Sequence, residues 1–261
     1  MKKIKVSIIV PVFNSSEILD ELNQRVFKIM KNINLLNNFE LIMINDFSND
    51  KSWEKIKELS TKYNYLKGIN LTENFGQHNA IMAGFNNCIG ELIITIDDDL
   101  QHPPEFLPDI IDKLNSYDVC YTNYRKRKHI IWKKIISNIN NIISSFLLNK
   151  PLKIYMSSFR GLKKKVVLNI IKFKKPDVYI DGLILRSTKN IAMITVDHNA
   201  RKSGSSNYTL KKLFILWSNM IIDFSFYPLR FASVFGLILK FFITVIRKKN
   251  VKPQYEIKEK I

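Results

Sequence analysis

Short runs rich in valine and isoleucine alternate with helical patterns along the N-terminal half of this chain. The runs are KVSIIVPVF, FELIMIND, LKGINLT and ELIITID, and helices are expected near residues 17–32, 51–63 and 77–88. Apolar strands separated by helices form a mainly parallel sheet that is covered on both faces. The sequence therefore predicts an α/β fold, and its 261 residues suffice for one main domain with an appendage.

The N-terminal run MKKIKVSIIVPVF has the basic start of a signal peptide, but its apolar part is short and passes into Pro11. We interpret this run as the first strand. Cys88 and Cys120 are the only cysteines, too few for a disulfide framework or a zinc cluster, which suits a reducing compartment.

Polar residues follow each predicted strand, at 14–17, 45–50, 74–77 and 97–101. Ligands bind outside the carboxyl ends of parallel strands, so these four clusters should converge at one edge of the sheet. Each cluster alone is compatible with turn and N-cap chemistry. Four clusters at one edge favour a ligand site.

Asp97, Asp98 and Asp99 come directly after a buried strand, where their like charges repel one another. Carboxylates in this position need water, cations or a metal for compensation. The alternative is an acidic turn that caps the next helix, with help from Pro103 and Pro104. The sequence therefore leaves a cation site and a capping turn open at this point.

Four motifs occur in order and at suitable spacing: VSIIVPVFN, INDFSNDKSWE, NFGQHNAIMAGF and DDDLQHPPE. With these motifs, residues 4–210 resemble the family 2 glycosyltransferases, and within them the polyprenyl-phosphate glycosyltransferases. That group includes dolichol-phosphate mannose synthases and undecaprenyl-phosphate sugar transferases. The resemblance implies a GT-A nucleotide-sugar-binding fold. It also implies inverting, metal-dependent transfer of a sugar from a nucleotide diphosphate sugar to undecaprenyl or dolichyl phosphate.

The resemblance implies that Asp97 and Asp99 are catalytic and that, with Gln101, they hold Mg²⁺ or Mn²⁺ against the donor diphosphate. Hard oxygen ligands independently suit these cations. The positions implied for nucleotide-sugar binding are Pro11, Phe13, Asn14, Glu17, Asn45, Asp46 and Asp98.

Two of these positions depart from the family pattern. Glu17 stands two places later than the family's glutamate, and Asn45 replaces the first of two aspartates. A UDP-sugar is the favoured donor, with a GDP-sugar as the alternative.

Between Val119 and Pro176 there are fifteen Lys or Arg and no Asp or Glu, in a chain of net charge +18. Aliphatic and aromatic residues are interleaved with these charges, which fits an anionic membrane surface better than a solvated helix or nucleic acid. Lys163, Lys164 and Lys165 are expected as surface charge that strengthens binding to anionic vesicles. The resemblance implies acceptor-phosphate contacts at Arg125, Lys133, Lys134, Ser137, Arg160, Ser205 and Tyr208.

The segment DHNARKSGSSNYTLKKL resembles a family loop that closes over the substrates, with Arg201 as a catalytic residue that stabilises the leaving diphosphate. Closure of such a loop excludes water from the donor. The alternative is a polar turn before the next helix.

From Leu213 the sequence is strongly apolar, but Asp223, Pro228, Arg230 and Lys240 interrupt a continuous membrane span. The expected organisation places the chain at the cytoplasmic face of the inner membrane and leaves homo-oligomerisation open. It consists of a catalytic domain over 1–210, an amphipathic interfacial helix over 211–227, a membrane-inserted segment over 228–247 and a basic polar tail over 248–261.

Two alternative functions remain open from the sequence. One is transfer of sugar directly onto a growing cell-surface glycan. The other is a non-catalytic membrane-associated relative, for which Asn45, the displaced Glu17 and the short C-terminal region are the arguments.

Overall fold

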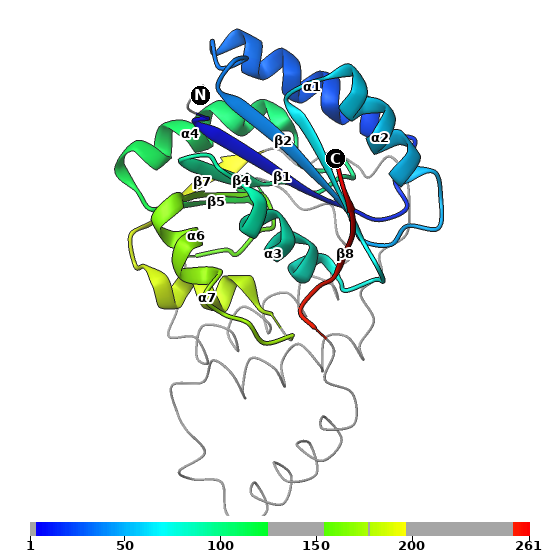
Figure 1. Cartoon of the computed structure of the whole chain (residues 1–261). Helices are drawn as coiled ribbons and strands as arrows, with labels where there is room; N and C mark the ends of the chain where they lie inside the picture. The colour runs from blue at the N-terminus through cyan, green and yellow to red at the C-terminus, as the bar shows by residue number, and fades with distance from the viewer. Residues whose placement is uncertain (1–3, 125–153, 177, 197–252) are drawn as a thin grey trace, which may run out of the picture.

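The computed structural model describes residues 4–124, 154–176, 178–196 and 253–261 (Figure 1). Their strands form one eight-stranded sheet in the order β7-β5-β6-β4-β1-β2-β3-β8. Parallel pairing joins the four strands predicted in the N-terminal half of the sequence. These strands are β1 (Val6–Val12), β2 (Phe39–Asn45), β3 (Leu66–Leu71) and β4 (Leu92–Thr95).

The second half of the chain completes the sheet with strands of both directions. β6 pairs antiparallel with β4 and β5, β8 pairs antiparallel with β3, and β5 pairs parallel with β7. The sheet is therefore mixed but mainly parallel. The added strands are β5 (Val119–Tyr124), β6 (Arg160–Lys163), β7 (Ile191–Val196) and β8 (Ile257–Lys260).

Helices cover both faces of the sheet, as predicted (Figure 1). One face packs against α1 (Leu19–Asn32), α2 (Ser52–Lys62) and α4 (Leu107–Ser116), which follows the 3-10 turn η1 (Pro104–Phe106). The other face packs against α3 (Gln77–Asn87), α6 (Lys164–Ile170) and α7 (Ile180–Ser187).

The alternation of side chains along β1 explains how one strand serves both layers. Ile8 and Val10 belong to the core beneath α1, α2 and α4, whereas Ile9 belongs to the core beneath α3. Successive residues of a strand point to opposite faces, so a run of apolar residues is needed where both faces are buried.

The C-terminal residues correct the expectation of a polar tail over 248–261. Residues 257–260 form β8, and Gly68 and Ile261 exchange two backbone hydrogen bonds of 3.0 Å at the sheet edge. The Trp53 indole donates to Glu259 at 3.1 Å. The sequence IKEKI does not predict a strand, because most side chains of β8 are exposed on the edge of the sheet. The segment therefore lacks the apolar content of the other strands.

Among the described residues, every helix is too short or too polar to cross a membrane. The expected interfacial helix (211–227) and membrane-inserted segment (228–247) lie outside the described residues.

Gly68→Ala tests the packing of this edge. A Cβ at this position would lie 2.6 Å from Ile56 Cγ2 and 2.9 Å from Ile261 Cγ1. We expect a loss of about 1–3 kcal/mol in the free energy of unfolding, measured by urea denaturation, because β-branched neighbours cannot easily move aside. The control is Lys258→Ala, an exposed β8 substitution that should cost no more than about 0.5 kcal/mol. Equal stability of the two variants would contradict the close packing of Ile56 and Ile261 around Gly68.

Candidate active site

The loops that follow β1 and β2 are joined by hydrogen bonds at the carboxyl edge of the sheet. The Asn14 amide donates to Ser48 Oγ at 3.0 Å, and the Asn49 amide donates to Asn14 Oδ1 at 2.8 Å. The Ser16 amide donates to Asp50 Oδ2 at 3.0 Å. These bonds make one polar rim from two of the four clusters that the sequence predicts to converge.

Three non-glycine residues in the edge loops have left-handed backbone conformations. They are Asn14 (φ 55°), Phe47 (φ 58°) and Leu100 (φ 55°), which follow β1, β2 and β4. Such conformations are costly for residues with a Cβ, particularly for leucine, and they tend to occur at functional sites. Three of the four such residues in the described chain therefore lie at the edge that carries the polar clusters, and the fourth, Asn34, lies between α1 and β2.

Asp97 receives hydrogen bonds on both oxygens of its carboxylate. Gln77 Nε2 donates to Oδ1 at 2.6 Å, and Ser158 Oγ donates to Oδ2 at 2.5 Å. His102 Nδ1 lies 3.5 Å from the same Oδ2. The contact of Gln77 with Asp97 confirms the predicted convergence of the clusters 74–77 and 97–101, although sequence analysis assigned Gln77 no role of its own. Ser158 and His102 were not identified as site residues, and Ser158 is far from Asp97 in sequence.

Asp98 joins the acidic loop to the loop that follows β1. Its Oδ2 accepts a hydrogen bond of 3.1 Å from the Phe13 amide. Burial, with a further contribution from the neighbouring carboxylates, raises the pKa of Asp98 to about 7. The structure thus gives Asp98 a loop-joining contact. Its expected role in nucleotide-sugar binding stays a prediction.

The donor atoms of this loop fit a hard divalent cation that is shared with a substrate. Asp97 is partly exposed and Asp99 is buried, with Asp99 Oδ1 accepting a 3.1 Å bond from the Gln101 amide. The described residues contain no group of three or more His, Cys, Asp or Glu side chains suited to hold a metal alone. Mg²⁺ and similar ions are commonly held by one or two carboxylates together with water and substrate phosphates, and this donor set matches that pattern.

The end of β2 fixes the loop that leads into α3. Asp46 is 3% exposed, and its carboxylate accepts the Phe75 amide at 2.8 Å and the Gly76 amide at 2.9 Å. Burial raises the pKa of Asp46, and these two hydrogen bonds partly offset the rise. Neighbouring Asn45 is also buried, and its Nδ2 donates to Asn70 Oδ1 at 2.7 Å.

The remaining predicted donor-site residues lie on the first strand and its loop. Pro11 is buried within β1, whereas Phe13, Asn14 and Glu17 are exposed beyond its end. The structure brings this group to the same sheet edge as Asp97.

Arg160, an expected acceptor-phosphate contact, belongs to a buried network in the structure. It is 1% exposed, and its guanidinium pairs with Asp181 and lies 6.0 Å from the ring centre of Tyr121. The Tyr121 hydroxyl donates to Asp181 Oδ1 at 2.8 Å. Arg160 Nε is buried without a hydrogen-bond partner, and the expected contact of Arg160 with the acceptor phosphate stays a prediction.

The other predicted acceptor and loop residues lie outside the described residues and stay predictions. They are Arg125, Lys133, Lys134, Ser137, Arg201, Ser205 and Tyr208.

Lys163, Lys164 and Lys165 lie at the amino edge of the parallel strands, opposite to Asp97. β6 runs antiparallel to β4, so Lys163 pairs with Leu92 at the start of β4. Lys165 Nζ is 2.8 Å from Asp118 Oδ1. Because these lysines lie opposite to the Asp97 loop, we expect them to contribute less to membrane binding than the sequence alone indicates.

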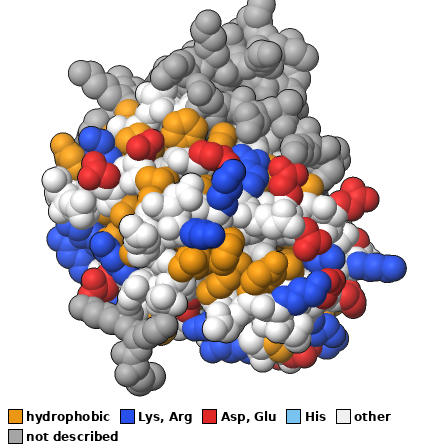
Figure 2. Space-filling model, turned by 90° about the horizontal axis from the view of Figure 1, so that it is seen from above, with side chains coloured by type: hydrophobic (Ala, Val, Ile, Leu, Met, Phe, Trp, Pro, Cys, Tyr) orange, Lys and Arg blue, Asp and Glu red, His pale blue; other side chains and the backbone are white. Residues whose placement is uncertain are grey.

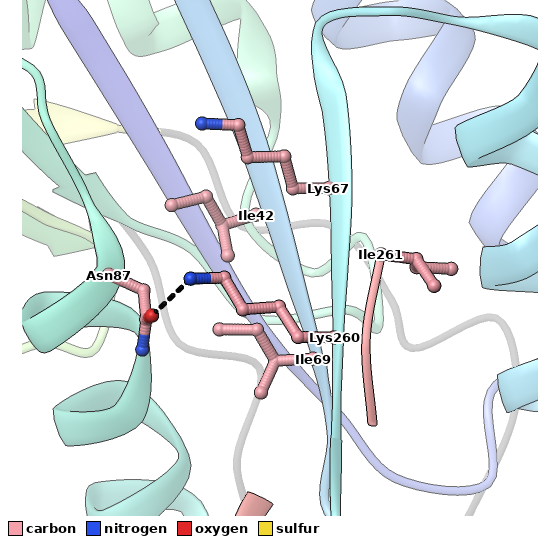
Figure 3. A pocket seen from close by; sticks show the side chains of 6 residues that line it. All are labelled: Ile42, Lys67, Ile69, Asn87, Lys260 and Ile261. Atoms are coloured by element: carbon pink, nitrogen blue, oxygen red, sulfur yellow. Dashed lines mark hydrogen bonds between the residues drawn. The ribbon is translucent and has the colours of Figure 1, made fainter. Parts of the chain in front are cut away.

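A pocket of about 390 Å³ lies beside β8 and is not the candidate site (Figure 3). The ammonium groups on its wall already have partners, Lys67 with Glu40 at 2.6 Å and Lys260 with Asn87 at 2.7 Å. The residues that line this pocket include none of those in the polar clusters at the carboxyl edge.

His78, in the first turn of α3, provides a test of burial near the site. Its ring packs edge-on against Tyr179 with 5.7 Å between centroids, and burial lowers the pKa of His78 to about 4. The unfolded chain protonates this histidine near pH 6.5, so its contribution to stability is present above pH 6.5 and is lost as the pH falls to about 4.

We expect His78→Gln to reduce the loss of stability between these two pH values by about 1.4 kcal/mol for each unit of pKa separation. Urea denaturation of wild type and variant at both pH values measures the difference. An identical pH dependence in both proteins would contradict the burial of His78.

A mixed, mainly parallel α/β sheet with the acidic loop Asp97–Asp99 at its carboxyl edge agrees with the GT-A fold that the sequence resemblance implies. The chain belongs to glycosyl transferase family 2, which it matches over residues 7–171. It is a glycosyltransferase.

Curated relatives extend this similarity over most of the chain. An undecaprenyl-phosphate 4-deoxy-4-formamido-L-arabinose transferase from Proteus mirabilis is 32% identical over 237 residues, which are 90% of this chain and 72% of the relative. The protein of the same name from Photorhabdus laumondii is 33% identical with the same coverage.

Among solved structures, the fold is similar to glucosyl-3-phosphoglycerate synthase from Mycobacterium tuberculosis, which was crystallised with Mn²⁺, UDP and phosphoglyceric acid. The TM-score is 0.58 at 15% identity, covering 83% of this chain and 76% of that one. At this identity the likeness establishes the fold alone.

Proposed function

We propose that this enzyme transfers a sugar from a nucleotide diphosphate sugar to undecaprenyl phosphate at the cytoplasmic face of a membrane. The observation that carries the proposal is the Asp97–Asp99 loop at the carboxyl edge of the sheet. The relatives from Proteus and Photorhabdus, both named for transfer involving undecaprenyl phosphate, support this acceptor.

For the donor we propose a UDP-sugar held together with Mg²⁺ or Mn²⁺. The similar mycobacterial structure, which contains Mn²⁺ and UDP, supports this choice over a GDP-sugar. Asp97, Asp99 and Gln101 are the proposed protein ligands. A bound cation would supply positive charge that neutralises the departing diphosphate.

The distribution of charge supports an anionic acceptor at the same edge. The described residues carry 21 Lys and Arg and 20 Asp and Glu, so they account for +1 of the net charge of +18. In Figure 2 basic and acidic side chains are interspersed on the face shown. Nearly all of the excess positive charge therefore belongs to residues 125–153 and 197–252.

The described chain meets both of these segments at the carboxyl edge. The segments start after β5 and β7, whose carboxyl ends lie there, and end shortly before β6 and β8, which run in the opposite direction. Both basic segments therefore join the described body at the edge of the sheet that carries the Asp97 loop. Excess positive charge at this edge would attract an anionic lipid surface and the phosphate of the acceptor.

The proposed chemistry needs no general base from the protein. A lipid phosphate is already an anion near neutral pH, so one of its oxygens attacks the anomeric carbon as the bond to the diphosphate breaks. Attack opposite to the leaving group inverts the configuration. We assign acceptor contacts to Arg125, Lys133, Lys134, Ser137, Ser205 and Tyr208, and we assign closure over the leaving group to Arg201.

Asp99→Asn tests the donor half of the proposal. Loss of one anionic oxygen should abolish transfer of radiolabel from UDP-sugars to undecaprenyl phosphate with Mg²⁺, and the unfolding midpoint should stay close to that of wild type. The control Asp109→Asn makes the same substitution at an exposed position of α4 and should retain activity. Near-normal transfer by Asp99→Asn would exclude this residue as a metal ligand.

Replacing Lys163, Lys164 and Lys165 together by Gln tests the orientation on the membrane. These side chains lie opposite to the proposed membrane edge, so sedimentation with anionic vesicles should change little in the triple variant. Neutralising Arg125, Arg127 and Lys128 instead should weaken binding by about 1 kcal/mol per charge, and added salt should reduce the difference. Equal losses in the two variants would contradict the proposed orientation.

A further inference from the structure

Asp97 is held by donors from two distant parts of the chain. Gln77 Nε2 comes from the first turn of α3 and lies 2.6 Å from Oδ1, whereas Ser158 Oγ comes from the segment before β6 and lies 2.5 Å from Oδ2. Both donors are neutral, and each engages a different oxygen. Together they restrict rotation of the carboxylate about its bond to Cβ.

The Ser158 donor is itself fixed by buried hydroxyl groups. Thr95 Oγ1 donates to the Ser158 carbonyl at 2.5 Å, and Thr122 Oγ1 donates to the Phe159 carbonyl at 2.8 Å. Thr95 and Thr122 are both 0% exposed. The position of the Ser158 hydroxyl relative to β4 is therefore determined by the sheet itself.

The Gln77 donor is fixed by the end of β2. Gly76 has φ 84°, a conformation that favours glycine, and directly precedes α3. Asp46 accepts the amides of Phe75 and Gly76, which fixes the direction in which the helix begins. Gln77 is the next residue, so its side chain reaches Asp97 from a start point set by a buried carboxylate.

We propose that Gln77 and Ser158 are positioning residues that orient Asp97 for a divalent cation before that cation binds. This inference rests on the proposed function, in which Asp97 is a metal ligand. Hydrogen-bond partners of metal-ligating carboxylates set the ligand's direction, and their loss typically lowers metal affinity by roughly 10- to 100-fold. Each oxygen of Asp97 retains acceptor capacity after accepting one hydrogen bond.

The probe for the test is Mn²⁺ in the presence of UDP, titrated into the full-length protein and followed by electron paramagnetic resonance of the free ion. We expect Gln77→Ala and Ser158→Ala each to raise the Kd for Mn²⁺ by roughly 10-fold or more. Ser158→Thr keeps the hydroxyl and should recover most of the affinity. Asn86→Ala removes an amide from the same helix, where its Nδ2 donates to the Met82 carbonyl, and should leave the Kd unchanged.

Two further measurements separate positioning from a structural role. UDP binding without metal and the urea midpoint should stay close to wild type in Gln77→Ala and Ser158→Ala. Parallel losses of metal affinity, UDP affinity and stability would overturn the inference, because a loosened fold would then explain them.

The same titration distinguishes this inference from the proposed function. If wild type fails to bind Mn²⁺ with UDP, the proposed donor site is wrong, and the positioning role falls with it. If wild type binds Mn²⁺ and both alanine variants bind it equally well, the positioning role alone is overturned and the donor site stands.

Discussion

Three adjacent carboxylates at the end of β4 share one loop because each is held by a different part of the chain. Asp97 bonds to Gln77 and Ser158, Asp98 bonds to the backbone of the β1 loop, and Asp99 bonds within its own turn. Separate partners point the carboxylates in separate directions, which reduces the repulsion that would otherwise disfavour the loop. The contacts that join the loops at the carboxyl edge therefore serve to keep the three carboxylates apart.

The distribution of net charge along the chain agrees with the roles that we propose for its parts. A nearly neutral α/β body carries the acidic loop, and nearly all of the excess of basic over acidic residues falls in the two segments that join the body at that edge. If the basic charge were spread over the body, anionic lipid could bind in many orientations. An excess of positive charge on segments that join the body at one edge would instead favour the orientation that we propose, with the donor loop facing the acceptor phosphate.

The sequence predicts those strands and helices whose residues follow a local pattern of apolar and polar side chains. β1 to β4 and α1 to α3 were found within a few residues because apolar runs and helical periodicity report burial directly. The contacts of Ser158 and Arg160 could not be foreseen, since they depend on β6 inserting antiparallel between β4 and β5. β8 was missed because an exposed edge strand carries little apolar signal. The motif order placed Asp97 and Asp99 together in one loop at the carboxyl edge, but it gave no sign that Arg160 is buried.

The buried network around Arg160 connects these observations. A buried ion pair is weak evidence for stability, because desolvation offsets much of its attraction. The network instead fixes geometry. Tyr121 on β5 and Arg160 on β6 both contact Asp181 on α7, so they hold these three elements in fixed relative positions. Arg160 pairs across the sheet with Thr95, and Thr95 bonds to Ser158, which bonds to Asp97. Arg160 is thus connected to the acidic loop through the placement of β6, in addition to any contact that it makes with a substrate.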